Sequence, residues 1–597
     1  MHPKLITGVI IVSAVVLAFA SVWNDSPIVD EIPHIGAGYS YVQKGDFRLN
    51  PEHPPLAKDL AGIALSFLTI NQSAFQTQHW LNEINGQWNF GRNLIFNSGN
   101  DAILMARVAK MPMLLFFIFS AIIIFHWARK IYGDKAGLLA VFLFSFSPTV
   151  LAHSRFVTTD IPALFGILLG TYFFVRFLEN QTKTNFVLAF VAFGIAQLTK
   201  FSLFLLNPLF IILAIGWGLA NSKRDGSEIQ GKANSVIKTL FLTAMIIVLG
   251  YVTIVSPIYS LHTINYPKIR QKADTIYLLN SYGNKTYSEK VIWASDKPFL
   301  RPLAQYGLGL LMVTQRNIGG NTTYFLGEIK GVAWKKYFPV VYFIKEPLAF
   351  WGLVAMALLS WTILLRPNRY KAKHWIKNHF SEFAMFVWLI IYWYASITAN
   401  INIGVRHLMP IYGFVFILLS GQLIDISKKI NKKFLLTAYH LLLTIFLGWY
   451  LFENLKIFPH YLTYFNQTAL FRPSWVSEGQ VGGGHLYVVD SNIDWGQDAK
   501  RLADWVDKNN ISKISLDYFG WSDAGYYLKN KYVWINAGKY KNSREFLADN
   551  PDGGYIAVSK SFFMGSRENS EKSYAWLDSY KPVADIGNSI FVWYITQ

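Results

Sequence analysis

The sequence predicts a polytopic α-helical membrane protein with a C-terminal α/β domain outside the membrane. Of its 597 residues, 52% are hydrophobic and only 15% are charged, whereas a soluble domain has about 25% charged residues. Aromatic residues make up 16% of the chain, which suits belts of Trp and Tyr at the two membrane surfaces. These proportions indicate an integral membrane protein before any single segment is considered.

The net charge of +19 at pH 7 agrees with basic cytoplasmic loops and with attraction to anionic membrane lipids. The basic residues are spread among loops and form no basic helix or stripe, so we expect no nucleic-acid partner. The chain has no Cys, which excludes disulfides and thiolate chemistry.

Eleven apolar segments approach the roughly 20 residues that a membrane-spanning helix needs. They are roughly 5–23, 106–126, 136–153, 161–178, 186–199, 201–220, 238–257, 341–365, 381–398, 408–426 and 434–452. Lys200 and Pro208 interrupt the region between the fourth and sixth segments, where a re-entrant turn is the alternative. Ala18-Phe19-Ala20 resembles a signal-cleavage pattern, but we expect an uncleaved first helix.

Four loops are rich in Lys and Arg, and short loops of this kind remain in the cytoplasm. They are 127–135, 221–238, 366–380 and 427–433. Eleven spans and a cytoplasmic N-terminus place all four on one side. We therefore expect, in the cell (plasma) membrane, a transmembrane domain over 1–452 with external loops 24–105 and 258–340. Residues 453–597 then form an extracytoplasmic domain.

The pattern of this last region differs from that of the spans. HLYVVDSN, KISLDYF, GGYIAVS and NSIFVWYIT favour strands, and QDAKRLADWVDKNN favours an amphipathic helix. Together they predict a small α/β domain. Asp490, Asp494 and Asp498 follow a predicted strand, where such domains commonly bind ligands. They equally suit capping of the next helix. DSNIDWGQD is no EF-hand loop, because Trp495 and Arg501 replace the required Gly and Glu.

The first external loop begins with two adjacent acids, Asp30 and Glu31. Neighbouring side chains point about 100° apart on a helix and to opposite faces of a strand, so Asp30 and Glu31 cannot easily contact the same atom of a ligand. We expect one to face a site and the other to pair with an Arg or to cap a helix. A solvated loop pair is the alternative.

NPEHPPLAKDL follows in the same loop, and Pro54 and Pro55 restrict its backbone. Lys58 then stands on the first turn of a helix close to the headgroup layer. An ammonium there either holds a phosphate as a point charge or simply extends its charge to the membrane interface.

Further cations and acids mark the outer ends of other spans. HSRFVTTD carries His153, Arg155 and Asp160; ARVAKMP carries Arg107 and Lys110; GVRHLMP carries Arg406 and His407. The cations suit either anionic headgroups or a pocket for a lipid-linked phosphate. The histidines and acids of the outer face also raise the alternative of a divalent metal. No HxxxH or HExxH spacing supports a metal site, so we expect no cofactor to be required.

The combination of VDEIPHIGAGY, GDFRLNPEHPPLAK, HSRFVTTD, GVRHLMPIY and VDSNIDWGQD resembles the polyprenyl-phosphate-sugar-dependent glycosyltransferases of the GT-C class. This class includes protein O-mannosyltransferases and the transferase that moves aminoarabinose onto lipid A. The likeness covers about residues 1–450. It implies many membrane helices with amphipathic helices on the outer face. It also implies inverting transfer of one sugar from an isoprenoid monophosphate to a hydroxyl acceptor.

The resemblance also implies roles for single residues. Asp30 matches the catalytic Asp, Glu31 its neighbour, and Asp160 an acid of the second external loop. Donor-phosphate contacts are implied for Lys58, Arg107 and Arg406, and the remaining residues expected to line the site are His34, His53, Arg155 and His407.

These roles make chemical sense. A carboxylate that takes the proton of an attacking hydroxyl contributes about 10²–10⁴-fold in rate, whereas a phosphate leaving group needs cations rather than an acid. The chain lacks the β-trefoil insertion of eukaryotic mannosyltransferases, which argues against a protein as the acceptor. A lipid or cell-wall glycan is the alternative acceptor. A transporter or flippase is a remoter alternative, since it would need more charges near mid-span than Lys200 provides.

Overall fold

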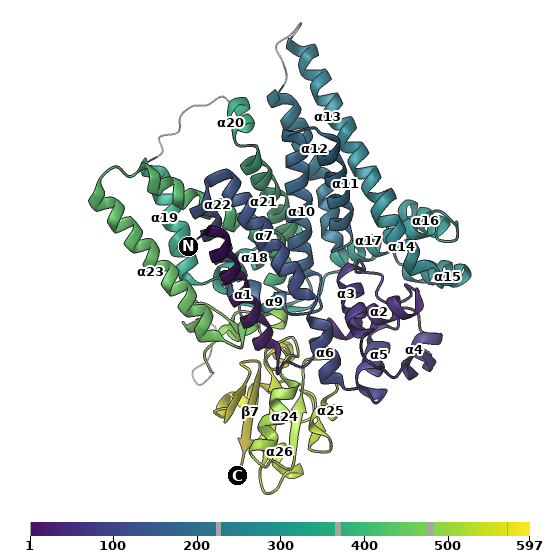
Figure 1. Cartoon of the computed structure of the whole chain (residues 1–597). Coiled ribbons are helices and arrows are strands. Elements are labelled where there is room, and N and C mark those ends of the chain that lie inside the picture. Colours follow the sequence, from purple (N-terminus) through teal and green to yellow (C-terminus); the bar gives the residue numbers. More distant parts are fainter. Residues whose placement is uncertain (1, 222–227, 365–371, 472, 474–480, 570) are drawn as a thin grey trace.

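The computed structural model of the chain describes residues 2–221, 228–364, 372–471, 473, 481–569 and 571–597. Long helices form one bundle, and a smaller α/β domain lies at one end of it, next to the end of α1 (Figure 1). Parts of two predicted cytoplasmic loops, within 221–238 and 366–380, lie outside the described residues.

Among the described residues, eight helices or joined helices are long and apolar enough to cross a membrane. They are α1 (Pro3–Val22), α6 (Ala102–Lys110) with α7 (Met113–Tyr132), α10 (Asp160–Glu179), η3 (Phe201–Leu205) with α12 (Leu206–Asn221), α13 (Glu228–Gly250) through η4 (Tyr251–Val255) to α14 (Ser256–Thr263), α21 (Phe380–Thr398), η5 (Val405–Leu408) with α22 (Met409–Lys429), and α23 (Lys433–Ile457). The chain is therefore a multi-pass membrane protein, as predicted.

Two bent pairs of helices raise this number to ten if each pair is one span. The first, α8 (Asp134–Ser145) with α9 (Pro148–Ser154), bends by 64°, and the second, α18 (Tyr337–Lys345) with α19 (Leu348–Leu364), bends by 106°. The predicted segment 186–199 is α11 (Lys183–Gln197), which has only 15 residues. All eleven predicted segments are thus helical, but the count of eleven spans is not confirmed.

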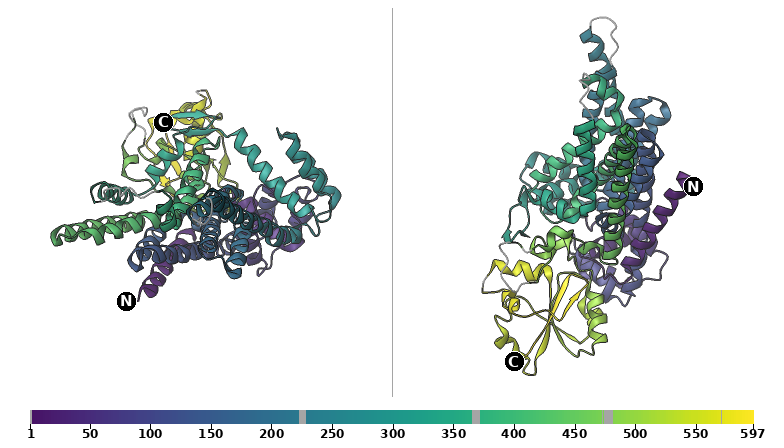
Figure 2. Two further views of the ribbon diagram at one scale, coloured as in Figure 1. Left: turned by 90° about the horizontal axis from the view of Figure 1, so that it is seen from above. Right: turned by 90° about the vertical axis from the view of Figure 1, so that its left-hand side faces the viewer.

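The centre of the bundle is the contact between α10 and α22. In each of these two spans, 72% of the most apolar 18-residue stretch is buried inside the protein. In α23, at the edge of the bundle, only 6% of the corresponding stretch is buried (Figure 2). A Cβ atom at Gly413 of α22 would lie 2.8 Å from the side chain of Leu168 of α10. A small residue at this contact therefore lets the helices approach closely, as is common in membranes. Because Asp160 begins α10 and Arg406 directly precedes α22, this packing brings the two charges together.

The two long loops between spans fold into short helices. The first contains α2 (Glu31–Lys44), α3 (Leu56–Leu65), α4 (Gln78–Leu81) and α5 (Gln87–Arg92); the second contains α15 (Lys268–Leu278), α16 (Lys285–Ala294), α17 (Arg301–Gly319) and the hairpin of β1 (Thr323–Phe325) and β2 (Glu328–Lys330). The backbones of helices α2 and α3 are in contact at Gly38 and Gly62. Only glycine allows this approach, because a Cβ atom at either position would collide with main-chain atoms of the other helix. This contact fixes the helix that carries the acidic pair.

The C-terminal domain contains one five-stranded sheet in the order β4-β3-β5-β7-β6. Its elements are α24 (Ala499–Lys508), β3 (Ile514–Asp517), α25 (Ala524–Leu528), β4 (Tyr532–Trp534), α26 (Ser543–Asp549), β5 (Gly554–Ser559), α27 (Lys560–Gly565), β6 (Ala584–Ile586) and β7 (Ile590–Ile595). Strand β3 is parallel to β4 and β5, and β7 is antiparallel to β5 and β6. Three of the four predicted strands are confirmed.

The fourth predicted strand, HLYVVDSN, is wrong. It forms the short turns η8 (Gly484–Leu486) and η9 (Asp490–Asn492), and Asp490 has a left-handed backbone with φ of 60°. A residue in this conformation interrupts an extended strand. Instead of joining the five-stranded sheet, the segment makes a single isolated bridge, between Val488 and Phe325.

Buried charges hold the C-terminal domain on the bundle. Asp25, just after α1, forms ion pairs with two arginines, and its side chain is only 1% exposed. Its Oδ2 lies 2.8 Å from Arg155 Nη1, and its Oδ1 lies 2.7 Å from Arg501 Nη2 of the C-terminal domain. Arg501 also pairs with Asp498. Burial alone would raise the pKa of Asp25, but Arg155 and Arg501 outweigh it and hold that pKa below its ordinary value. The network places the C-terminal domain on the same face of the bundle as Asp30.

We predict that Asp25→Asn destabilises the docked protein by about 3–5 kcal/mol, because two buried guanidinium groups lose their shared partner. Thermal unfolding in detergent and limited proteolysis between bundle and C-terminal domain measure the effect. The matched control is Asp504→Asn, which removes a half-exposed pair with Lys500 and should cost about 0–1 kcal/mol. Equal stabilities of the two variants would contradict this role for Asp25.

Candidate active site

Arg406 is the centre of the charged cluster at the end of α10 and α22 that is close to the C-terminal domain. Its Nη1 donates to Asp30 Oδ2 at 2.8 Å and lies 3.6 Å from Asp160 Oδ2. Its Nε donates to Ser491 Oγ at 3.2 Å, and the guanidinium stacks 4.1 Å above the ring of Trp495. One cation thus joins Asp30 and Asp160 of the bundle to the C-terminal domain.

Asp160 lies at the first position of α10 and is completely buried. Its Oδ1 accepts a hydrogen bond from Lys200 at 2.7 Å, while its Oδ2 has no hydrogen-bond partner among the described residues. Two histidines, His153 and His407, interact electrostatically with Asp160. His153 Nδ1 and His407 Nε2 also have no hydrogen-bond partner among the described residues. An unsatisfied buried polar group costs about 1–3 kcal/mol, and such groups are characteristic of sites that a polar ligand completes.

Asp30 and Glu31 diverge, as adjacent side chains must. Asp30 is 23% exposed, whereas the Glu31 side chain is fully buried. Glu31 accepts hydrogen bonds at 2.9 Å from the backbone N–H groups of Ile28 and Val157, and Lys110 Nζ lies 3.1 Å away. Glu31 therefore connects the start of α2 to the segment that precedes α10 and positions Asp30, while both of its own oxygens are occupied.

His34 and His53 lie beside the acidic pair. Their rings are 4.9 Å apart, and His34 Nδ1 donates to the backbone oxygen of Val157 at 2.7 Å. Burial lowers the pKa of both imidazoles. The two rings are therefore neutral at neutral pH and line the site without adding positive charge.

Lys58 is buried beneath this loop. Its ammonium donates to the backbone oxygen and Oδ1 of Asn50, both at 2.8 Å, to the backbone oxygen of His53 at 2.7 Å and to Tyr41 Oη at 3.0 Å. Four oxygens compete for its three N–H groups. Lys58 therefore stabilises the segment that carries His53, and a contact with the donor phosphate stays a prediction.

Arg107 and Arg155 are held elsewhere. Arg107 donates to the backbone oxygen of Trp23 at 2.8 Å and covers that ring at 3.8 Å. Arg155 belongs to the buried network around Asp25. In the part of the chain that the structure describes, neither guanidinium makes an ion pair with Asp30 or Asp160.

Arg316 is a cation of this site that the sequence reasoning missed. It lies near the end of α17, is exposed, and interacts electrostatically with His53, His407 and Asp490. Its side chain makes no ion pair with any other described residue, unlike Arg406 and Lys200. The sequence offers no signal for it, because TQRNIGG is separated from the other site motifs and approaches them only through folding.

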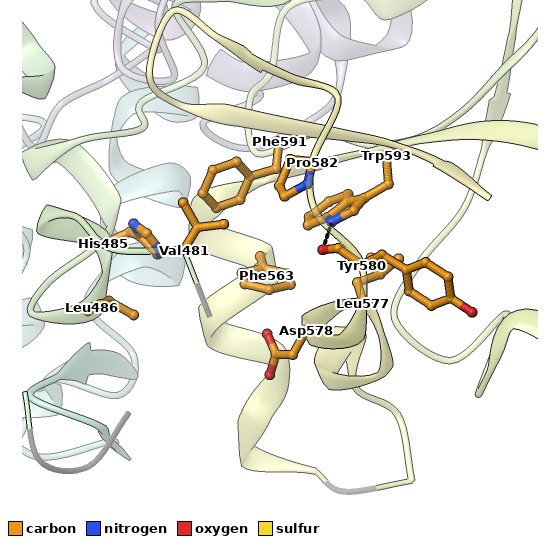
Figure 3. A pocket seen from close by; sticks show the side chains of 10 residues that line it. All are labelled: Val481, His485, Leu486, Phe563, Leu577, Asp578, Tyr580, Pro582, Phe591 and Trp593. Atoms are coloured by element: carbon orange, nitrogen blue, oxygen red, sulfur yellow. Dashed lines mark hydrogen bonds between the residues drawn. The ribbon is translucent and has the colours of Figure 1, made fainter. Parts of the chain in front are cut away.

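A second hollow lies within the C-terminal domain. It is lined mainly by apolar and aromatic side chains: Val481, His485, Leu486, Phe563, Leu577, Asp578, Tyr580, Pro582, Phe591 and Trp593 (Figure 3). Its cavity volume of about 10 Å³ corresponds to about one water molecule. This hollow is therefore too small to hold a sugar.

Comparisons with known proteins agree with the predicted class. Residues 95–251 match the family model of dolichyl-phosphate-mannose-protein mannosyltransferases. The protein O-mannosyltransferase complex Pmt1-Pmt2 of S. cerevisiae, solved with its sugar donor, has a TM-score of 0.52 at 13% identity, over 77% of this chain and 90% of that chain. The predicted resemblance is thereby confirmed: the protein has the fold of the GT-C glycosyltransferases.

Further similarities are weaker. ArnT from Cupriavidus metallidurans, bound to undecaprenyl phosphate, has a TM-score of 0.42 at 11% identity over 98% of this chain and 97% of that chain. An uncharacterised protein of Aquifex aeolicus (strain VF5) is 30% identical over 84 residues, which cover 14% of this chain and only 17% of that protein.

We predict that Glu31→Gln lowers the free energy of unfolding by about 3–5 kcal/mol, because Lys110 is left as an unpaired buried cation. Adding Lys110→Met should recover most of the loss, since it removes that cation at similar volume. Thermal unfolding of the purified single and double variants measures both effects. A double variant no more stable than Glu31→Gln would show that the ion pair is not the cause.

Proposed function

We propose that the protein transfers a single sugar from a polyprenyl monophosphate to a hydroxyl acceptor, with inversion, at the extracytoplasmic membrane face. The observation that carries the proposal is the Arg406-bridged pair of Asp30 and Asp160 in a GT-C fold. The acceptor is a hydroxyl of a protein, a lipid or a cell-wall glycan.

Asp30 is the proposed general base. Of the acids Asp30, Glu31 and Asp160, it alone is partly exposed and can meet an incoming acceptor. The acceptor oxygen forms the new bond to the anomeric carbon as the bond from that carbon to the phosphate oxygen breaks. The hydroxyl proton passes to Asp30, and the bond electrons leave with the polyprenyl phosphate. Arg406 orients the carboxylate from the side opposite the substrate.

The leaving phosphate needs positive charge. Arg406 and Lys200 are already paired with Asp30 and Asp160, and Lys58 and Arg107 donate to protein oxygens. We therefore favour Arg316 as the cation that receives the donor phosphate, because its exposed guanidinium has no ion pair with another described residue. A guanidinium matches phosphate geometry with two parallel hydrogen bonds. These organic cations make a metal unnecessary in the proposed reaction.

Asp30→Asn should reduce transfer at least 100-fold while donor binding stays nearly unchanged, because only the proton acceptor is lost. The assay follows sugar release from the native polyprenyl-phosphate-sugar pool, extracted from membranes, by purified protein in nanodiscs with EDTA present. The control Asp552→Asn makes the same chemical change at an exposed position of the C-terminal domain and should keep full activity. Wild-type rates in Asp30→Asn would refute the assignment, and loss of activity with EDTA would refute the metal-free reaction.

Arg316→Ala should weaken donor binding about 10- to 100-fold, as expected for a charge-assisted hydrogen bond of roughly 1.5–3 kcal/mol. Displacement of a fluorescent polyprenyl phosphate measures the dissociation constant directly. Arg544→Ala serves as the control, because Arg544 is an exposed arginine of α26 in the C-terminal domain. If Arg316→Ala binds the lipid phosphate like the control, another cation receives the phosphate.

A further inference from the structure

The loop Asp490–Asp498 extends from the C-terminal domain into the candidate active site. Ser491 accepts the Nε hydrogen bond of Arg406, and Trp495 supports the guanidinium from below. Asn492 Oδ1 accepts the backbone N–H of Val405 at 2.9 Å. This loop is therefore part of the wall of the site, although it belongs to another domain.

The three carboxylates of this loop are used differently. Asp494 accepts the backbone N–H groups of Gly496 at 3.3 Å and Ser561 at 3.2 Å. Asp498 pairs with Arg501 and accepts Ser589 Oγ–H at 2.7 Å. Both are completely buried. These two acids therefore stabilise the domain and its docking, and neither can reach a substrate.

Asp490 is the exception. It is half-buried, its Oδ1 accepts the N–H of Ser491, and its Oδ2 has no hydrogen bond to any described residue. The carboxylate interacts electrostatically with Arg406 of η5, with Asp30 at the start of α2 and with Arg316 of α17. Asp490 therefore has an available oxygen on the side of the bundle's charged cluster.

The backbone at Asp490 is held in an unfavourable conformation. Its φ of 60° lies in the left-handed region, where Gly is the least strained residue and a side chain is uncommon. Its N–H donates to Ser561 Oγ at 3.0 Å, which helps to fix this conformation. Strain of this kind, of order 1–3 kcal/mol, persists where the surroundings impose it and is concentrated at functional sites. Asp is one of the few residues with a side chain that adopt this region readily, so Asp490 can occupy the position.

We propose that Asp490 is an acceptor-binding residue: its Oδ2 accepts a hydrogen bond from a second donor group of the acceptor and holds the reacting hydroxyl beside Asp30. This inference rests on the proposed function. A second carboxylate near Asp30 repels the donor phosphate but attracts a hydroxyl or amide donor, which is why the acceptor is the ligand it suits. Burial raises the pKa of Asp490 to about 6, so the carboxylate is charged at neutral pH and gains a proton below about pH 6.

Asp490→Gly provides a sharp test, because it removes the carboxylate and relieves the backbone. Purified wild type and variant receive the native polyprenyl-phosphate-sugar pool, with glycerol as the acceptor probe and water as the competing acceptor. The expected result is a 10- to 100-fold higher KM for glycerol in the variant, with unchanged donor hydrolysis and an unchanged or higher unfolding temperature. In the wild type, KM for glycerol should rise below about pH 6, and in the variant this rise should disappear.

Asp490→Asn is the second variant, since Asn also tolerates the left-handed region. It should bind glycerol less tightly than the wild type and lose the same pH dependence. An unchanged KM in both variants, or a wild type that transfers to glycerol no better than to water, would overturn the role of Asp490. Loss of donor hydrolysis in the variants would also overturn it. A wild type that releases no sugar at all would instead refute the proposed function.

Discussion

The site depends on one buried cation, the guanidinium of Arg406. Moving such a group out of water costs several kcal/mol unless its partners satisfy it. Here those partners are Asp30 before α2, Asp160 at the start of α10, and Ser491 and the Trp495 ring from the C-terminal domain. The cost is offset only when all three regions are in place, so the folded site and the docked domain require each other.

The helix bundle makes this arrangement possible. Close packing of α10 and α22 sets the distance between Asp160 and Arg406, and Glu31 with Lys110 sets the position of the loop that carries Asp30. The second buried network, around Asp25, keeps the C-terminal domain against the same face. We infer that these structural ion pairs have a common purpose, which is to prevent the charged cluster from reorganising before substrate arrives. Such preorganisation is a major source of electrostatic catalysis.

Much of this could be predicted from the sequence. Apolar segment lengths predicted each candidate membrane helix of the described residues, although α11 is shorter than a normal span and two pairs are sharply bent. Motif resemblance also singled out Asp30, Asp160 and Arg406, which the structure brings together. Spacing could not show which cations are already engaged. From the sequence, Lys58 and Arg107 both qualify as phosphate ligands. Only the folded structure shows that their cations already donate to protein oxygens, those of Asn50 and Trp23. Arg316 is distant in sequence from the other motifs, so no local pattern could place it there. The sequence singles out Asp490 as a possible ligand-binding or capping residue, but only the fold brings it near Asp30.

A cryo-electron microscopy structure of Asp30→Asn in nanodiscs, loaded with the native polyprenyl-phosphate-sugar donor, tests the central claim most directly. We expect the anomeric carbon to face residue 30, with the sugar on the side of that residue opposite Arg406 and the phosphate at the guanidinium of Arg316. A donor bound with its sugar away from residue 30, or with its phosphate away from Arg316, would contradict this arrangement.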